Sequence, residues 1–407
     1  MTALADDRYI VISSDGHAGG QMHEYRDHLE SKYHAEFDEW VKTYVNPFED
    51  LRSENAYRNW DSAARLRELE DDGVVAEVLF PNTIPPFFPS GNLLARPPSA
   101  EAYELRWAGL RAHNRWMADF CADTPGRRAG MAQIFLNDID DAVAEIHWAR
   151  EHGLIGGILL PGVPPDSGLP PLFAPHYDPI WAACEELDLP VNNHSGASGP
   201  EPGAYVASMA VFMVELGWFS HRVFWHLAFG GAFARFPRLK LVLTEQSAGW
   251  VPSVLAMLDH QYERFLDPGT AESHFGAELV RQVTKPPSWY WEHNCYVGAS
   301  FFRPSEVPLR HEIGVGRIMW GQDYPHIEGT YPYTTEALRN TFAGIDAAEV
   351  APMVGLTAAD VYGFDLDVLA PVAARVGPRV DEVAVPLDHV PEDSRSIAFA
   401  GEDVKPW

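Results

Sequence analysis

The chain has few cysteines and no long apolar segment. Cys121, Cys184 and Cys295 are its only cysteines, and they form no Cys-x-x-Cys pair. This spacing excludes a disulfide framework and a thiolate metal site, so we expect three buried, reduced thiols. No apolar run of about 18 residues occurs, and the first residues lack a basic segment followed by an apolar one. We therefore predict a cytoplasmic protein without membrane association.

Basic residues are also scarce. Lys and Arg number 30 against 58 Asp and Glu, which gives a formal net charge of −28. Binding to nucleic acid needs clusters of Lys or Arg that neutralise phosphates, so this composition excludes a nucleic-acid partner. Hydrophobic residues, by contrast, make up 46% of the chain. They are sufficient to bury a large core.

Eight short β-branched segments recur along the chain. They cover residues 9–15, 74–80, 128–136, 156–161, 189–195, 239–245, 295–301 and 317–323. Most are continuous apolar runs, which is typical of parallel strands buried on both faces. Helices with an apolar face are predicted between them, over residues 140–153, 178–188 and 248–266. The alternation predicts an α/β fold, a parallel (β/α)₈ TIM barrel.

Two regions fall outside this repeat. Residues 81–99 are rich in proline and aromatic residues and follow the second strand, where a loop of the barrel mouth belongs. A lid, a substrate wall and a packing loop are the alternatives. Residues 371–407 have scattered prolines and acids without a helical period, which predicts an extended C-terminal tail on the barrel or on a neighbouring subunit. The predicted barrel domain is thus 1–370, with the insertion at 81–99.

Residues that can bind a metal stand at the carboxyl ends of predicted strands, where the function of such barrels is concentrated. Asp15 and His17 end the first strand, and positions i and i+2 of a strand project to the same face. His194 ends the fifth strand and Asp323 the eighth. Each residue alone also fits a turn, a helix cap or a structural histidine. Their coincidence favours a site for Zn, Mn or Fe.

Four segments carry a resemblance to a known family. They are "SSDGH" (13–17), "VNNHSG" (191–196), "FARFPRLKLVLTEQSAGWVP" (233–252) and "IMWGQDYPHIEGTYP" (318–332). In these segments the chain resembles the amidohydrolase superfamily, in the branch of metal-dependent hydrolases that contains aminocarboxymuconate semialdehyde decarboxylase and γ-resorcylate decarboxylase. The resemblance covers roughly residues 9–365. It implies a distorted (β/α)₈ barrel whose metal is held by Asp15, His17, His194 and Asp323.

Two positions depart from the pattern of this family. Many relatives have an acid three residues after the first-motif histidine, where this chain has Gly20. The small residue would leave room beside the metal for a substrate or a second ion. The decarboxylases have a catalytic histidine at the end of the sixth strand, where this chain has Glu245. A carboxylate there is a metal ligand, or a base near neutral pH if it is desolvated. This departure weakens the decarboxylase prediction.

Two enzymatic functions remain open, both on a small-molecule substrate. In the first, a metal-activated water attacks a carboxylate-bearing substrate while Asp323 or Glu245 accepts the proton; C–C cleavage and decarboxylation are variants. In the second, Glu245, His326 and Glu328 help to bind a second ion, and an Fe or Mn pair activates O₂. In that case the chain resembles the 2-aminoisobutyrate hydroxylase system, a complex of two barrel subunits. A third alternative is a barrel that binds metal only to hold a partner.

The predicted site can be stated residue by residue. The catalytic residues are Asp323 and Glu245, and the metal ligands are Asp15, His17, His194, Asp323, Glu245 and His326. Trp250, His226 and Arg303 are assigned to the substrate pocket, with core packing as the alternative for His226 and an ion pair for Arg303. We expect one divalent ion, with two as the alternative. The expected assembly is a homodimer or a hetero-oligomer with a related barrel subunit.

Overall fold

The computed structural model describes residues 7–46, 50–89, 96–196, 199–200 and 203–399. Within them nine strands pair in parallel, and every predicted strand segment overlaps at least one of them. The strands are β1 (Ile12–Ala18), β2 (Ala76–Pro81), β3 (Arg128–Gly130), β4 (Ala132–Gln133), β5 (Ile158–Leu159), β6 (Val191–His194), β7 (Leu241–Thr244), β8 (Cys295–Ser300) and β9 (Ile318–Gly321). Met131 interrupts the predicted third strand, which becomes β3 and β4.

The strands run in sequence order around the fold, from β1 to β3 in one sheet and from β4 to β9 in the other. The last strand returns to the first, because His17 N–H donates to Tyr324 O (2.7 Å) and Asp323 N–H donates to Asp15 O (2.8 Å). The gap beside β3 is bridged by Met131 N–H, which donates to Leu79 O (3.2 Å). The prediction of a distorted TIM barrel is confirmed. The carboxyl ends of strands from both halves of the chain therefore lie together at the mouth of the barrel.

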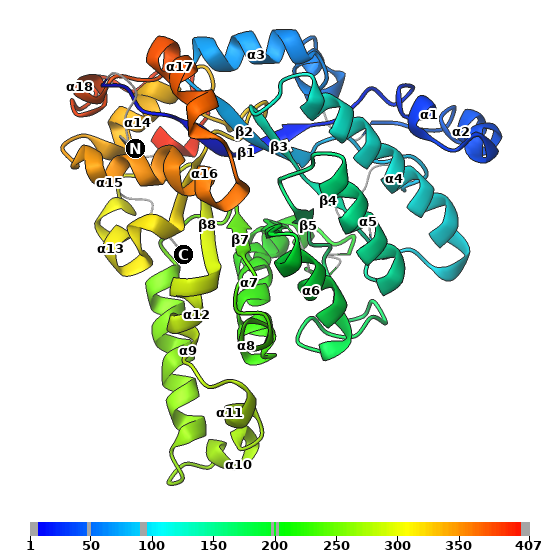
Figure 1. Cartoon of the computed structure of the whole chain (residues 1–407), viewed down its shortest axis with the longest axis vertical. Helices are drawn as coiled ribbons and strands as arrows, with labels where there is room; N and C mark the ends of the chain where they lie inside the picture. The colour runs from blue at the N-terminus through cyan, green and yellow to red at the C-terminus, as the bar shows by residue number, and fades with distance from the viewer. Residues whose placement is uncertain (1–6, 47–49, 90–95, 197–198, 201–202, 400–407) are drawn as a thin grey trace.

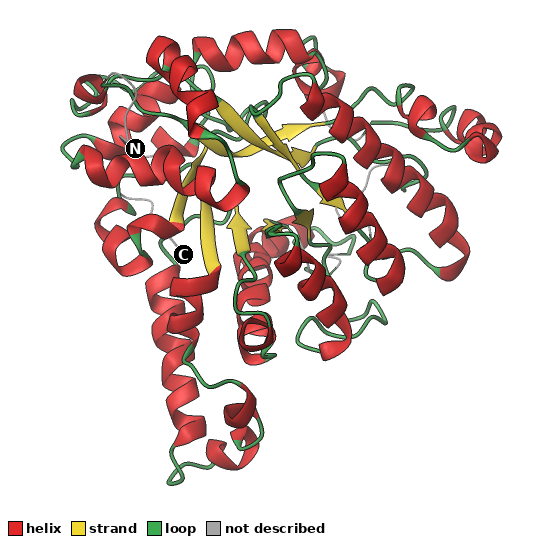
Figure 2. Ribbon diagram, viewed as in Figure 1, coloured by secondary structure: helices red, strands yellow, loops and turns green. Residues whose placement is uncertain are grey.

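Helices surround the strands (Figures 1 and 2). The longer ones are α3 (Ser62–Asp71), α4 (Ala100–Ala122), α5 (Ile139–Glu151), α6 (Asp178–Glu186), α7 (Ser208–Phe229), α9 (Val251–Leu266), α12 (Pro287–Asn294), α14 (Thr334–Phe342) and α17 (Leu366–Val376). The shorter ones are α1 (Tyr25–His28), α2 (His34–Trp40), α8 (Ala232–Arg235), α10 (Glu272–Gly276), α11 (Leu279–Gln282), α13 (Arg310–Ile313), α15 (Ala347–Ala351), α16 (Thr357–Tyr362) and α18 (Val380–Val383). The predicted helices correspond to α5, α6 and α9.

Helices α16 and α17 pack near the amino ends of the strands. Tyr362 and Leu369 are buried in one apolar cluster with Ile12, Val242 and Met319 from three strands. The Tyr362 hydroxyl also donates to Asn192 Oδ1 at the start of β6 (2.8 Å). Apolar packing thus covers the amino ends of the strands, and a polar site is expected at their carboxyl ends.

The two regions outside the repeat lie against the barrel. The described parts of 81–99 contain no helix after β2, and Ser99 caps α4 by accepting the Ala102 N–H. The predicted tail begins inside α17, which ends at Val376, and the rest of its described part includes the short helix α18. It then lies on α14 and the turn before it, where Asn340 Nδ2 donates to Ala398 O (2.9 Å) and Tyr333 donates to Asp393 (2.7 Å).

The three cysteines are buried and unpaired, as expected. Among the described helices, none has both the length and the apolar character that a membrane crossing requires.

Candidate metal centre

Asp15 and His17 lie side by side at the mouth of the barrel. They stand two positions apart on β1, and His17 Nε2 is 3.2 Å from Asp15 Oδ1. Both side chains are buried. From the end of β8, the Ser300 hydroxyl donates to Asp15 Oδ2 (2.5 Å), which fixes the carboxylate and leaves Oδ1 directed at the histidine. Because side chains alternate between the two faces of a strand, residues two positions apart point to the same side.

His194 and Asp323 complete this cluster from two other strand ends. His194 Nε2 is 3.6 Å from Asp15 Oδ1, and Asp323 Oδ1 is 3.0 Å from His17 Nε2. Asp323 follows β9 in a left-handed conformation, with φ of 60°. Such a φ is rare outside glycine, and residues held there concentrate at functional sites. The four residues predicted from three strand ends therefore converge.

Four atoms of this cluster are buried and form no hydrogen bond of regular geometry among the described residues, although one of them lies within ion-pair distance of two others. They are Asp15 Oδ1, His17 Nε2, His194 Nε2 and Asp323 Oδ2. Leaving buried polar atoms unpaired is unfavourable by about 1 to 3 kcal/mol each, so their convergence calls for a ligand. Two imidazole nitrogens and two carboxylate oxygens are a donor set that suits a divalent cation. The residues present thus fit a metal ion.

Glu245 reaches the cluster from the turn after β7. Its Oε2 is 3.4 Å from His194 Nδ1 and accepts a hydrogen bond from the Ser195 hydroxyl. Like Asp323 it has a positive φ, 56°. Burial raises the pKa of Glu245; the His194 imidazole opposes this, and the Asp323 and Asp15 carboxylates reinforce it. Glu245 therefore tends to keep a proton at a pH where most glutamates have lost theirs.

His326 is close to the cluster, but both of its nitrogens are engaged. Its Nδ1 is 2.9 Å from Asp323 Oδ1, and its Nε2 is 3.1 Å from Asn82 Oδ1. Burial lowers the pKa of His326, but the Asp323 carboxylate outweighs it and raises the pKa to about 10. Although its position allows ligation together with His17 and Asp323, a metal bond would displace one of these two contacts. In this arrangement His326 orients Asp323.

Glu328 belongs to a second group of acids. Its carboxylate lies near those of Glu245 and Asp323, with the nearest oxygens of the three within 4.8 Å of one another. Glu328 is exposed, whereas Asp323 is buried. This group could accept a second cation beside the first.

Residues that the sequence did not single out shape the rest of the centre. Phe80 of β2 places its ring 4.7 Å from the His194 ring and 5.8 Å from the His17 ring. Asn82, just after the same strand, holds His326. The only available signal for Asn82 was a lone amide at a strand end. Gly20, by contrast, opens no space beside the metal, because a Cβ atom there would lie 2.6 Å from the Trp116 indole nitrogen. That prediction was wrong.

A buried ion network supports β1 from outside. The Arg65 guanidinium forms a two-point contact with Glu77 (2.6 and 2.8 Å), and its Nη1 donates to His17 O (2.8 Å). Arg128 reaches the same glutamate at 3.3 Å. Arg65 therefore fixes the backbone that carries His17.

The three predicted pocket residues make their contacts elsewhere. Trp250 is buried in the core and stacks on His221 with ring centroids 3.8 Å apart. Arg303 is buried against Glu306 at 3.3 Å. His226 lies near the C-terminal end of α7, against Phe173. A helix that follows a strand runs back along it, so the end of α7 is far from the mouth. None of these contacts is with the four-residue cluster, and the assignment of the three residues to a substrate pocket stays a prediction.

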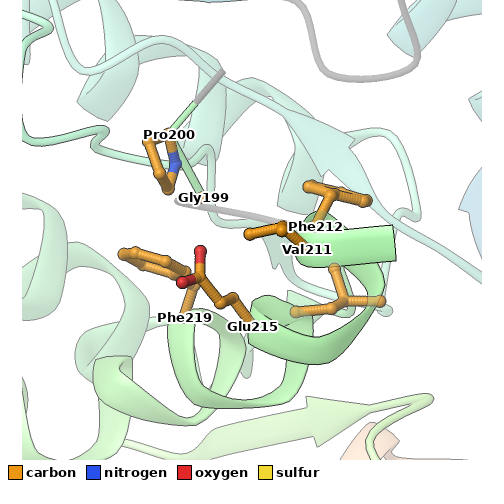
Figure 3. A pocket seen from close by; sticks show the side chains of 7 residues that line it. Gly199, Pro200, Val211, Phe212, Glu215 and Phe219 are labelled. Carbon is orange, nitrogen blue, oxygen red and sulfur yellow. The ribbon is translucent and has the colours of Figure 1, made fainter. Parts of the chain in front are cut away.

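A cavity of about 180 Å³ lies between the loop after β6 and the first half of α7. Phe219 and Glu215 point from the helix toward Gly199 and Pro200 of the loop (Figure 3). The neighbouring Ser220 accepts the Gly196 N–H, two residues beyond His194 (3.2 Å). The cavity thus adjoins the loop that follows the cluster histidine His194, and its walls are mostly apolar.

Residues 65–364 match the family model described as Amidohydrolase. Among curated proteins, γ-resorcylate decarboxylase of Rhodococcus jostii (strain RHA1) is 27% identical over 282 residues, which are 65% of this chain and 80% of that protein. Decarboxylase orsB of Emericella nidulans is 28% identical over 247 residues, 56% of this chain and 66% of that protein.

Solved structures share the fold at low identity. An amidohydrolase of Mycobacterium avium subsp. paratuberculosis K-10 has a TM-score of 0.63 at 18% identity, covering 88% of this chain and 99% of that one. The 5-carboxyvanillate decarboxylase of Sphingomonas paucimobilis has a TM-score of 0.61 at 19% identity, covering 87% and 99%. A dihydroxybenzoic acid decarboxylase of Polaromonas sp. JS666, with bound manganese and 2-nitroresorcinol, has a TM-score of 0.58 at 18% identity, covering 87% and 96%.

Proposed function

The chain belongs to the amidohydrolase family, and from this premise we propose that it is a metal-dependent decarboxylase of hydroxylated aromatic acids. The observation that carries the proposal is the convergence of four unpaired ligand atoms from Asp15, His17, His194 and Asp323. The two curated relatives described above are decarboxylases, and a manganese-bound dihydroxybenzoic acid decarboxylase shares the fold. Of the reactions open from the sequence, these relatives favour decarboxylation over hydrolysis.

The four ligands would hold one divalent ion, for which manganese is the first candidate. When bound, such an ion supplies positive charge that stabilises negative charge on the substrate oxygens. Ser300 keeps the Asp15 carboxylate in its orientation, and His326 does the same for Asp323. The Phe80 ring beside His17 and His194 gives an aromatic substrate an apolar wall.

Glu245 is the proposed proton donor. Decarboxylation breaks the bond between the ring carbon and the carboxylate, and the electron pair stays on the ring carbon while CO₂ leaves. That carbon then needs a proton. Glu245 lies beside the cluster, 3.4 Å from His194, and it would transfer a proton to this carbon and regain one from water. A protonated glutamate can in this way take the place of the histidine found in related decarboxylases.

The proposal is tested with manganese-loaded protein, γ-resorcylate and 5-carboxyvanillate. We expect release of CO₂ together with an equal amount of the decarboxylated phenol. Protein with one bound equivalent of manganese and no turnover of any hydroxylated aromatic acid would overturn the proposal. The His17→Ala variant serves as the metal-free control.

A dinuclear oxygenase is the second candidate, because the acids of Glu245, Asp323 and Glu328 form a second group next to the first. Metal analysis separates the two functions. Two equivalents of Fe or Mn with substrate-dependent O₂ consumption would replace decarboxylation with oxygenation. A single equivalent without O₂ consumption would exclude the oxygenase.

A further inference from the structure

Arg106 in α4 is a buried cation without an anionic partner in the described part of the chain. It is 6% exposed, and its Nε and Nη2 atoms are buried without a hydrogen-bond partner there. Burial, with no acidic neighbour contributing, lowers the pKa of Arg106 to about 10. The chain has 58 acidic residues against 30 basic ones, so an acidic partner for a structural arginine would be easy to supply.

Other buried arginines of this protein do have such partners. Arg65 and Arg128 share Glu77, and Arg303 pairs with Glu306. A buried charge is strongly unfavourable unless it is paired, which explains these arrangements. Arg106 departs from the pattern.

The guanidinium of Arg106 lies against two aromatic rings near the mouth, which stack on each other with their centroids 5.7 Å apart. Its central carbon is 4.3 Å from the centroid of the Phe88 ring and 5.3 Å from that of Phe135. Phe135 follows the end of β4 by two residues, and Phe88 is in the loop after β2. The same end of β2 supplies Asn82 to His326. Arg106 therefore belongs to the face of the barrel that carries the metal centre.

A guanidinium held against aromatic rings is complementary to one kind of ligand. Its N–H groups can bind a carboxylate at two points, and the neighbouring rings provide apolar surface for an aromatic ring. We propose that Arg106 binds a carboxylate of the substrate. The inference rests on the proposed function. It narrows the substrate to aromatic acids with a second carboxylate, in addition to the one that is lost at the metal centre.

The experiment measures binding of isophthalate and benzoate to the full-length protein, as purified and after chelation of metal, by calorimetry and by the shift in melting temperature. Wild type should bind isophthalate at least tenfold more tightly than benzoate. Arg106→Met should remove this preference, and Arg106→Lys should restore part of it. Arg111→Met, which removes a more exposed arginine from the same helix, is the matched control and should keep it.

The melting temperature without ligand separates this role from a structural one. If Arg106 serves a ligand, Arg106→Met should melt at or above the wild-type temperature, since it removes an unpaired buried charge. A lower melting temperature combined with an unchanged isophthalate shift would make Arg106 a packing residue and overturn the inference. Isophthalate binding that needs Arg106, in a protein that decarboxylates no aromatic acid, would instead refute the proposed function and leave this site standing.

Discussion

The imidazole of His17 lies 3.0 Å from the carboxylate of Asp323, although the two residues come from the first strand and from just after the last. Backbone hydrogen bonds between β1 and the segment after β9 hold this contact in place. The hydrogen bonds that close the barrel therefore also bring the residues of the metal centre together.

Metal content should depend on Asp323. Its Oδ2 is one of the four unpaired buried atoms, and replacing the carboxylate by an amide removes a charge from the ligand set. We expect Asp323→Asn to lower the bound manganese at least tenfold, measured by elemental analysis after dialysis. Glu328→Gln is the control and should keep the first equivalent, because Glu328 lies outside the four-residue cluster. A full metal complement in Asp323→Asn would disprove the proposed ligand set.

Replacement of Glu245 should separate turnover from metal binding. Glutamine keeps the size of the side chain and the contact with Ser195, but it cannot deliver the proton. Loss of a general acid typically lowers kcat by about 10²- to 10⁴-fold, and we expect this in Glu245→Gln with little change in KM. Metal content should stay the same. If one equivalent is lost instead, Glu245 is a ligand.

Arg65 should be important for stability. Removing it leaves the Glu77 carboxylate buried with one of its two arginine partners missing and frees the His17 carbonyl. Breaking a buried ion pair is destabilising by about 3 to 5 kcal/mol, so Arg65→Met should lower the free energy of unfolding in urea by an amount in this range. The matched control is Arg26→Met, which breaks an exposed pair with Asp38. Its midpoint should change little, and equal losses in both variants would refute the network.

Stability should fall as the pH rises toward neutrality because of Asp72. Burial raises the pKa of Asp72 from 3.8 to about 7. The folded state thus binds a proton that the unfolded state has lost, and unfolding becomes easier between pH 4 and 7. Three pH units correspond to roughly 4 kcal/mol.

The variant that tests this prediction is Asp72→Asn. The side-chain oxygen that remains in the variant can still accept the Thr334 N–H, and Gln322 can turn its unpartnered Oε1 toward the new amide. We expect urea unfolding at pH 8 to show a more stable protein, and the decline between pH 4 and 7 to be smaller. A variant with the wild-type pH dependence would exclude Asp72 as its source.

The sequence predicted the strands well because their signal is local. Continuous apolar runs are needed wherever a strand is buried on both faces, and all eight runs contain strand residues. The principal difference is at Met131, where the third run is interrupted. The cluster of Asp15, His17, His194 and Asp323 followed for the same reason. In parallel strands around a barrel, residues at the carboxyl ends must share one face.

Residues outside the strand ends could not be placed in this way. The assignment of His226, Trp250 and Arg303 to a substrate pocket stays a prediction, because the direction of a side chain in a helix or loop depends on its packing, and their described contacts are with other residues. Asn82 was missed because its contact with His326 joins segments that are far apart in the chain. Arg106 was missed because its burial without an acidic partner among the described residues is a property of the folded chain.

The sequence by itself determined the barrel, its acidic and cysteine-poor character, and which residue types meet at the mouth, since hydrophobic patterning and strand alternation are local properties. Only the tertiary structure decided how those residues are engaged. It showed which ligand atoms lack partners within the described ranges, that Asn82 and Asp323 engage both nitrogens of His326, and that Arg106 is buried there without an acid. These facts depend on distances between segments far apart in the chain, and such distances exist only after the barrel has closed.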